Sequence, residues 1–296
     1  MTTERNQAAE RTAIIGIVVT IILGAVIAWA GSDDGNTIGD GPRLFAVLTL
    51  VAFAINIVGF VPSFLARTEH YYDLAGSFTY IAVTVLALLL ANDLDARSVI
   101  VGVLVLIWAS RLGSFLFRRV KRAGKDGRFD EIKQSFLRFL MAWMIQALWV
   151  ALTVGAALAA ITSGAKTSFG VLVIIGLVIW IIGFAIEVVS DTQKTAFKKD
   201  PANDGEFITT GLWAWSRHPN YFGEITLWTG IALLALPALS GWQFLTLVSP
   251  LFVATLLTRV SGVPLLERRA DKRWGGQAEY ESYKANTPVL LMRPPR

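Results

Sequence analysis

Polar side chains gather between residues 187 and 224, directly after a long apolar stretch. If that stretch continues as a helix, four charged residues recur at i, i+4, i+7 and i+11 and share one helix face: Glu187, Asp191, Lys194 and Lys198. Charged groups at the edge of an apolar stretch are costly, which makes them candidates for a functional site. The alternative is a solvated helix end with i,i+4 ion pairs.

A second cluster has charged, amide and aromatic side chains close together: Arg217, His218, Asn220, Tyr221 and Glu224. Pro219 is favoured in the first turn of a helix, where its missing N–H would have no partner anyway. A helix starting near His218 would present free backbone N–H groups and a positive dipole end, which bind phosphate. Asn220 and Glu224 share a face and could bind a carboxamide or a ribose hydroxyl. Alternatively, the cation and the imidazole only anchor the chain at a membrane interface.

Two basic segments flank these clusters. The tail over 261–288 carries Tyr280 and Tyr283 at i,i+3 and would lie on anionic lipid or cover a cofactor, with Glu267 and Tyr283 as the contact candidates. The loop over 118–133 has seven cations and no series of aromatic residues, which favours a topology signal or lipid contact over a phosphate site.

Polar residues also occur at other apolar stretches, as Asp73 and Arg111. Asp73 stands at the start of an apolar run, where keeping a carboxylate charged would be costly, so it is a candidate acid. The alternative is a helix N-cap, because aspartate is a favoured capping residue.

The composition restricts the available chemistry. The chain has no cysteine, which excludes disulfides, thiolate metal sites, iron–sulfur clusters and cysteine nucleophiles. His70 and His218 are the only histidines, too few for the histidine-rich di-iron site of a membrane desaturase or hydroxylase. We expect no metal site, so any redox chemistry must use a bound organic cofactor or haem.

Membrane helices must position these residues, because 54% of the chain is apolar and only 17% charged. Eight runs are long enough to cross a bilayer: 13–30, 42–65, 74–91, 98–117, 138–161, 168–188, 221–239 and 242–259. The sequence therefore predicts an all-α polytopic integral membrane bundle of about eight transmembrane helices. The first run is too long for a signal peptide and is expected to be retained.

The lysines and arginines predict the orientation. Of 27, only Arg43, Arg97 and Lys166 fall on one side of the predicted bundle, which places both termini in the cytosol. The polar residues then lie toward the cytosolic half, predicting a cavity that opens to the cytosol. No repeat or linker divides the chain, so 1–296 is expected to be one membrane domain with cytosolic cofactor segments 187–224 and 261–288.

These segments resemble the bacterial DUF1295 membrane proteins over nearly the whole chain, and through them the steroid 5-alpha reductase and sterol reductase superfamily. The matching segments begin RLGSF, SDTQK and SGVPL and cover 111–133, 190–224 and 261–288. The more distant similarity to the steroid 5-alpha reductases rests on the element from His218 to Glu224, on Asp191 and on the tail.

The resemblance implies NADPH-dependent reduction of a carbon–carbon double bond conjugated to a ketone in a lipophilic, steroid- or isoprenoid-like substrate. It implies that Asn220 and Glu224 contact the nicotinamide side. It assigns ribose and phosphate contacts to other residues: Arg111, Asp191, Lys198, Glu267 and Tyr283. The remaining cofactor candidates are cations and ring side chains beside them: Lys194, Arg217, His218 and Tyr221.

The resemblance also implies how the substrate carbonyl is held. Those enzymes use a glutamate and a tyrosine, and here Asp73 takes the place of the glutamate, with Tyr72 beside it. Trp108 takes the place of the tyrosine. An indole N–H can donate a hydrogen bond but cannot transfer a proton, so the match predicts reductase chemistry without predicting activity on steroids.

Two other functions stay open. Integral-membrane methyltransferases of the isoprenylcysteine or phospholipid type share a similar Arg-His-Pro-x-Tyr-x-Gly element, but their S-adenosylmethionine lacks the phosphates that the cations here would bind. A transporter or lipid-binding protein would need polar groups near the midplane and often has inverted repeats. The expected partners are membrane lipid and a lipophilic small molecule, with no nucleic acid and no obligate protein partner, in a bacterial cytoplasmic membrane.

Overall fold

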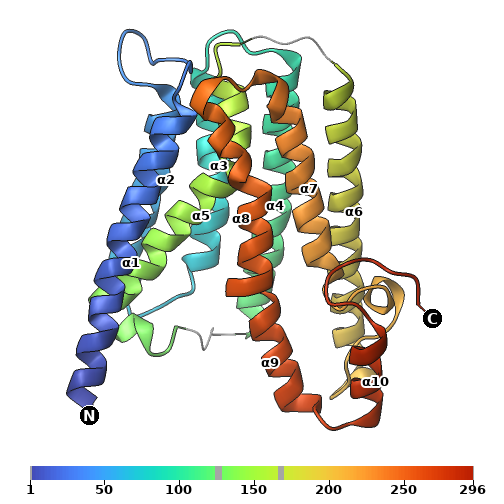
Figure 1. Cartoon of the computed structure of the whole chain (residues 1–296). Coiled ribbons are helices and arrows are strands. Elements are labelled where there is room, and N and C mark those ends of the chain that lie inside the picture. The colour runs from blue at the N-terminus through green and yellow to red at the C-terminus, as the bar shows by residue number, and fades with distance from the viewer. Residues whose placement is uncertain (1, 124–128, 166–169, 296) are drawn as a thin grey trace. The chain divides into compact units, whose positions relative to one another are not determined.

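Figure 1 presents the computed structural model of the chain, which describes residues 2–123, 129–165 and 170–295. Every regular element in these ranges is a helix, apart from two isolated β-bridges. Eight helical segments are long and apolar enough to cross a membrane: Asn6–Gly31, Leu44–Leu65, Tyr72–Leu90, Ala96–Arg118, Phe136–Thr162, Val171–Lys199, Pro219–Ala238 and Gly241–Trp274. The predicted all-α bundle with eight membrane helices is confirmed.

The α-helices are α1 Thr2–Gly31, α2 Leu44–Leu65, α3 Tyr72–Leu90, α4 Ala96–Ala123, α5 Phe136–Thr162, α6 Val171–Lys199, α7 Pro219–Ala235, α8 Val248–Thr255, α9 Val263–Trp274 and α10 Ala278–Asn286. Short helical turns join them: η1 Ile132–Gln134, η2 Pro201–Asn203, η3 Gly211–Ala214, η4 Leu236–Ala238, η5 Gly241–Leu247 and the π-helical η6 Leu256–Val260. The last predicted span, 242–259, is therefore built from three consecutive helical segments.

The chain divides into two compact units. Unit 1 comprises Met1–Gly170 and Ala235–Val248, and unit 2 comprises Val171–Leu234 and Ser249–Arg296. A single membrane domain over 1–296 stays a prediction. Part of the basic 118–133 loop, and Lys166, lie outside the described residues.

Helix α5 forms the centre of unit 1 and packs against α1, α2, α3, α4 and η5. Within its apolar window 83% of the residues are buried, against 28–39% in α1 to α4. Its second half is rich in alanine and contains Gly155, and such small side chains let helix backbones approach closely in a membrane. The outer helices keep large apolar side chains exposed, such as Ile15 on α1 and Val58 on α2, as expected of surfaces that face lipid.

Paired glycines hold α6 and α7 together in unit 2. A Cβ added to Gly176 would lie 2.8 Å from the carbonyl oxygen of Gly230, and one added to Gly183 would lie 2.7 Å from that of Gly223. Both distances are shorter than real Cβ contacts, so only glycine permits this approach. Along each helix the two glycines are seven residues, or two helical turns, apart. Their order is opposite on the two helices, because the earlier glycine of α6 pairs with the later glycine of α7.

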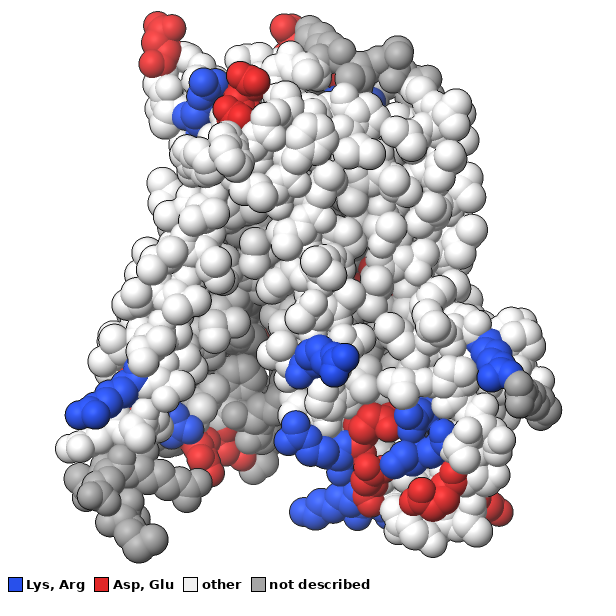
Figure 2. All heavy atoms as spheres, viewed as in Figure 1, with Lys and Arg blue, Asp and Glu red and all other residues white. Residues whose placement is uncertain are grey.

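The last two helices of unit 2 carry many charged side chains. Figure 2 shows Lys and Arg intermingled with Asp and Glu over α9 and α10, while the face of α8 in this view is uncharged. This amphipathic end carries Glu267 and Tyr283, two of the predicted site residues.

Candidate active site

The glycine pairs place the polar end of α6 beside the start of α7. Helix α6 continues to Lys199, which is the condition under which its charged residues share one face, and Glu187 and Asp191 are only 3% and 8% exposed on it. The Asn220 side-chain amide donates to the Asp191 carboxylate over 3.3 Å. A Cβ at Gly223 would lie 2.7 Å from the Glu187 backbone nitrogen, so this glycine allows the two polar segments to meet.

Glu267 of α9 binds the two residues that precede α7. The Arg217 guanidinium donates to Glu267 Oε2 over 2.8 Å, and His218 Nε2 lies 2.8 Å from Oε1. The Tyr221 ring stacks on the imidazole, with centroids 5.6 Å apart and planes 9° apart. Burial lowers the pKa of His218 below its ordinary 6.5, although the hydrogen bond with Glu267 opposes this. The imidazole is therefore neutral near pH 7, and Nε2 carries the proton because the carboxylate only accepts.

Three buried polar atoms in this turn have no hydrogen-bond partner among the residues that the structure describes: Arg217 Nε, His218 Nδ1 and Asn220 Oδ1. Leaving such an atom unsatisfied costs about 1–3 kcal/mol. Because Nε2 of His218 carries the proton, His218 Nδ1 is an acceptor, as is Asn220 Oδ1, and Arg217 Nε is a donor. The turn can therefore bind a polar group that both donates and accepts hydrogen bonds.

Lys194 and Tyr283 meet at Trp213, which sequence reasoning did not single out. The Lys194 ammonium lies 4.0 Å from the centroid of the Trp213 ring, within the range of a cation–π interaction. The Tyr283 hydroxyl donates to the Trp213 backbone carbonyl over 2.7 Å, and the Trp213 indole donates to the Ser190 carbonyl over 3.0 Å. Trp213 thus joins α6 to α10, so α10 closes over the chain between α6 and α7.

The segment 288–293, which we call the C-terminal strap, binds the chain just before α7. The Arg217 backbone N–H donates to the Pro288 carbonyl over 2.9 Å, and the Arg293 N–H donates to the Trp215 carbonyl over 3.0 Å. Ser216 is fully buried, and its hydroxyl donates to the Leu290 carbonyl over 2.9 Å while it accepts from the His218 N–H. Ser216 is a second residue that sequence reasoning missed.

The remaining predicted residues of unit 2 lie at the edge of this cluster. Glu224 is half-buried one turn after Asn220 on α7, on the predicted shared face, and Lys198 is exposed in the last turn of α6. The structure thus brings the predicted cofactor residues of unit 2 to adjoining ends of α6, α7, α9 and α10.

Asp73 and Tyr72 lie in the first turn of α3 in unit 1. The N-cap of α3 is Tyr71, so the interpretation of Asp73 as the N-cap is wrong: the helix begins two residues earlier than the apolar run 74–91. The Tyr72 hydroxyl donates to the Ala142 carbonyl over 3.0 Å, and its ring packs edge-on against Trp143, with centroids 5.3 Å apart. Tyr72 therefore has a structural role in the packing of α3 on α5.

Trp108 and Arg111 lie on α4, which packs on α3. The buried Trp108 meets the ring of Tyr80 edge-on, with centroids 5.1 Å apart, and the Arg111 guanidinium lies 5.3 Å from the Phe115 centroid. Tyr80 was not predicted, yet it follows Asp73 by seven residues, or two turns, on the same face of α3. That spacing could have identified it.

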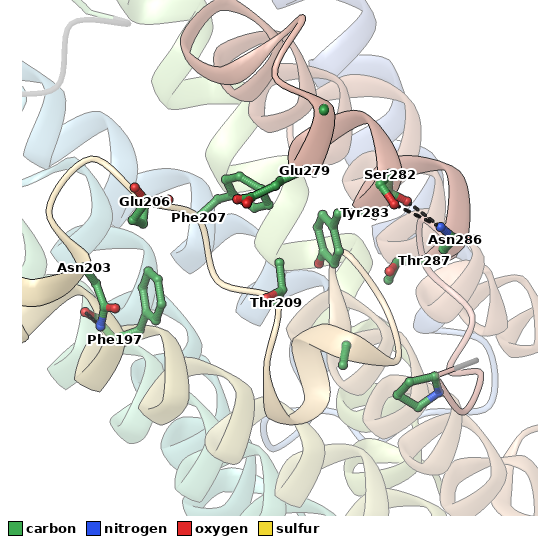
Figure 3. A pocket seen from close by; sticks show the side chains of 13 residues that line it. Phe197, Asn203, Glu206, Phe207, Thr209, Glu279, Ser282, Tyr283, Asn286 and Thr287 are labelled. Carbon is green, nitrogen blue, oxygen red and sulfur yellow. Dashed lines mark hydrogen bonds between the residues drawn. The ribbon is translucent and has the colours of Figure 1, made fainter.

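A separate pocket of about 760 Å³ lies entirely within unit 2 (Figure 3). The segment 203–209 and α10 supply most of its lining, and Tyr283 is the one predicted site residue among them. Among the described residues, no group of three or more His, Asp or Glu side chains could hold a metal ion.

Three relatives match different fractions of the chain. Uncharacterized protein C594.04c of Schizosaccharomyces pombe is 24% identical over 259 residues, which is 77% of this chain and 67% of that protein. The 3-oxo-5-alpha-steroid 4-dehydrogenase 1 of Rattus norvegicus is 31% identical over 117 residues, 39% of each chain. The probable O-methyltransferase ustE of Ustilaginoidea virens is 33% identical over 99 residues, 33% of this chain and 32% of that protein. The matches thus span about two fifths of the dehydrogenase and a third of the methyltransferase.

No solved structure matches the chain. The family described as "Protein of unknown function (DUF1295)" matches residues 59–287, which include α3, α4 and every polar residue of the α6–α7 cluster. The chain, which has eight membrane helices and polar residues where the end of α6 meets the start of α7, is a member of the DUF1295 family.

Proposed function

We propose that this protein is a membrane-embedded NADPH-dependent reductase, acting on a carbon–carbon double bond conjugated to a ketone in a lipophilic substrate. The observation that carries the proposal is the set of three buried, unsatisfied polar atoms at the start of α7, beside the buried Asp191 carboxylate. The partial similarity to a 3-oxo-5-alpha-steroid 4-dehydrogenase supports the reaction class.

The polar atoms of this cluster match the groups of NADPH. Asn220 Oδ1 can accept a hydrogen bond from the nicotinamide carboxamide, and the Asp191 carboxylate can accept one from a ribose hydroxyl. Lys194 supplies positive charge for a phosphate, and Arg217 has an unsatisfied Nε donor for another. When bound, NADPH supplies the hydride that adds to the β-carbon of the enone.

The residues of α3 and α4 would act on the substrate. The Asp73 carboxyl group would act as the acid, donating a hydrogen bond to the ketone oxygen and stabilising the negative charge that develops there. The Tyr72 hydroxyl donates to the Ala142 carbonyl. Trp108, with the neighbouring Tyr80, is the second donor in this proposal. Water would protonate the α-carbon.

A methyltransferase is the second candidate, and one contact favours it. Glu267 neutralises Arg217, which lowers the positive charge available for the phosphates of NADPH. S-adenosylmethionine has no phosphate and would not need that charge. The partial similarity to a probable O-methyltransferase agrees with this alternative.

Cofactor titration of the purified protein in lipid nanodiscs separates the two candidates. Tryptophan emission should be quenched as NADPH binds, because the reduced nicotinamide absorbs at the wavelengths at which tryptophan emits. We expect Glu224→Gln to weaken NADPH binding by about ten- to a hundred-fold, since it removes a charge-assisted hydrogen bond of about 1.5–3 kcal/mol. We expect Asn220→Ala to weaken it by up to about ten-fold, since it removes a neutral hydrogen bond of about 0.5–1.5 kcal/mol. Asn92→Ala, an exposed asparagine of unit 1, is the matched control and should bind normally.

The outcomes of this titration decide the function. If the protein binds S-adenosylmethionine and does not bind NADPH, the proposed function becomes that of a methyltransferase. NADPH affinity that is unchanged in both Asn220→Ala and Glu224→Gln would remove the α7 turn from the cofactor site.

A further inference from the structure

The proposed reductase leaves the pocket of Figure 3 unused. Its thirteen lining residues come from the end of α6, the segment 203–209, Ala214, α10 with Thr287, and Pro295. Its volume of about 760 Å³ lies in the range of small-molecule sites. Tyr283 contributes its ring to the pocket, while its hydroxyl is held by the Trp213 carbonyl.

The charge of the lining differs from that of the surrounding surface. Helices α6, α9 and α10 carry many lysines and arginines, but none of the thirteen lining residues is a cation. The charged residues in the lining are Glu206 and Glu279, both exposed, and the structure gives neither carboxylate a hydrogen bond or ion pair with a described residue. The pocket therefore disfavours phosphate groups and favours a cation.

The polar atoms of the lining are mainly acceptors. The amide N–H groups of Asn203 and Asn286 already donate to the carbonyls of Phe197 and Ser282, over 3.1 and 2.8 Å. Their amide oxygens, together with the two carboxylates, remain to accept hydrogen bonds, and the hydroxyls of Thr209 and Thr287 can accept as well. A ligand rich in N–H donors complements this set.

Aromatic rings complete the lining. Phe207 lies at the centre of a ring cluster, with its centroid 5.8 Å from that of Tyr283 and 5.3 Å from that of Tyr280. Figure 3 shows Phe207 and Glu279 directed toward one another from opposite sides of the pocket. An ammonium group is attracted to ring faces as well as to carboxylates, and unit 2 already contains such a contact between Lys194 and Trp213.

We propose that this pocket binds an aliphatic ammonium compound, with the carbon chain against Phe197 and Phe207 and the ammonium groups on Glu206 and Glu279. A free polyamine has such ammonium groups, whereas the single ammonium group of an ethanolamine lipid adjoins a phosphate, which this lining disfavours. The site is distinct from the polar cluster at the start of α7, so the proposal stands independently of the reductase activity.

Equilibrium dialysis with radiolabelled spermidine tests the site on the full chain in nanodiscs of phosphatidylcholine. We expect saturable binding at a stoichiometry of one, and binding about ten-fold weaker in the double variant Glu206→Gln with Glu279→Gln, because two exposed ion pairs are lost. Glu281→Gln, on the same helix but outside the pocket, is the matched control and should bind spermidine as the natural chain does. Replacing phosphatidylcholine by phosphatidylethanolamine should leave spermidine binding unchanged, and displacement of spermidine by this lipid would contradict the proposed polyamine ligand.

The proposal fails if spermidine does not bind saturably, or if the double variant binds it as tightly as Glu281→Gln. It also fails if Mg²⁺ at equal ionic strength displaces spermidine equally well, since a site built from rings and acceptors should prefer the organic cation. Both substituted glutamates are exposed, and an unchanged size-exclusion profile of the double variant confirms that reduced binding does not reflect misfolding.

Discussion

At the scale of single residues, the burial of His218 makes stability depend on pH. Its folded pKa lies below 6.5, so between these values the unfolded chain binds more protons than the folded chain. The contribution of neutral His218 to the free energy of unfolding is therefore fully present above about pH 6.5. This contribution is lost as the pH falls through the folded pKa of His218. The charged groups that act on the imidazole are Glu267, Lys194 and Arg217. We expect the thermal midpoint to decrease between about pH 7 and 5, and to decrease less in His218→Gln, by scanning fluorimetry.

Also at the residue scale, substitutions of Asp73 and Tyr72 should distinguish an effect on turnover from an effect on stability. Asp73→Ala should retain NADPH binding but lose turnover of an enone by about a hundred-fold or more, as the loss of an oxyanion donor does. Asp73→Asn, which still donates a hydrogen bond, should retain part of the activity. Tyr72→Phe is the matched control: it removes the bond to Ala142, which should cost about 0.5–1.5 kcal/mol of stability and leave turnover unchanged. Normal turnover in Asp73→Ala would assign the carbonyl donor to Trp108 or Tyr80.

At the scale of elements, the α6–α7 contact sets the geometry of the site. A methyl group at Gly183 would meet the backbone of Gly223 and Leu227, so Gly183→Ala must separate the helices. We expect this variant to lower NADPH affinity by at least ten-fold, because Asp191 and Asn220 move apart. Gly155→Ala on α5 is the control, since the nearest atom would be 3.7 Å away and alanine favours helix by about 1 kcal/mol. Equal cofactor affinity in the two variants would contradict the role of the glycine pairs.

The C-terminal strap is the second element that positions the site. Ser216→Ala removes the hydroxyl that joins the strap to the His218 N–H, and the buried groups left unpaired should cost about 1–3 kcal/mol. We expect weaker NADPH binding with an unchanged maximal rate, and recovery in Ser216→Thr. A lower thermal midpoint with normal cofactor affinity would restrict Ser216 to a structural role.

At the scale of the whole molecule, the orientation in the membrane is open to a direct measurement. The chain has no cysteine, so a single introduced thiol is labelled without background. With both termini in the cytosol, Glu131→Cys should be protected from an impermeant maleimide added outside intact cells, and Asp40→Cys should react. The opposite pattern would move the proposed site to the other face of the membrane.

The sequence predicted most of this molecule's helices because hydropathy reports directly on membrane spans. It also predicted that α7 starts near His218, since the preference of Pro219 for the first turn of a helix is local. The continuation of α6 past its apolar run was considered only as a condition. It did not reveal the partners of Tyr72 or the role of Trp213, because those depend on backbone carbonyls of segments distant in sequence. The start of α3 was misplaced because the helix begins before its apolar run.

The interlocked glycines of α6 and α7 also bear on how a ligand enters. Two helices whose backbones touch at points two turns apart can neither slide nor rotate without a clash, so this wall of the site acts as a rigid body. Any opening of the polar cluster must come from segments held by separable hydrogen bonds, namely α9, α10 and the strap. The release of NADP⁺ would then depend on the rate at which the tail of unit 2 detaches, rather than on motion within the membrane helices.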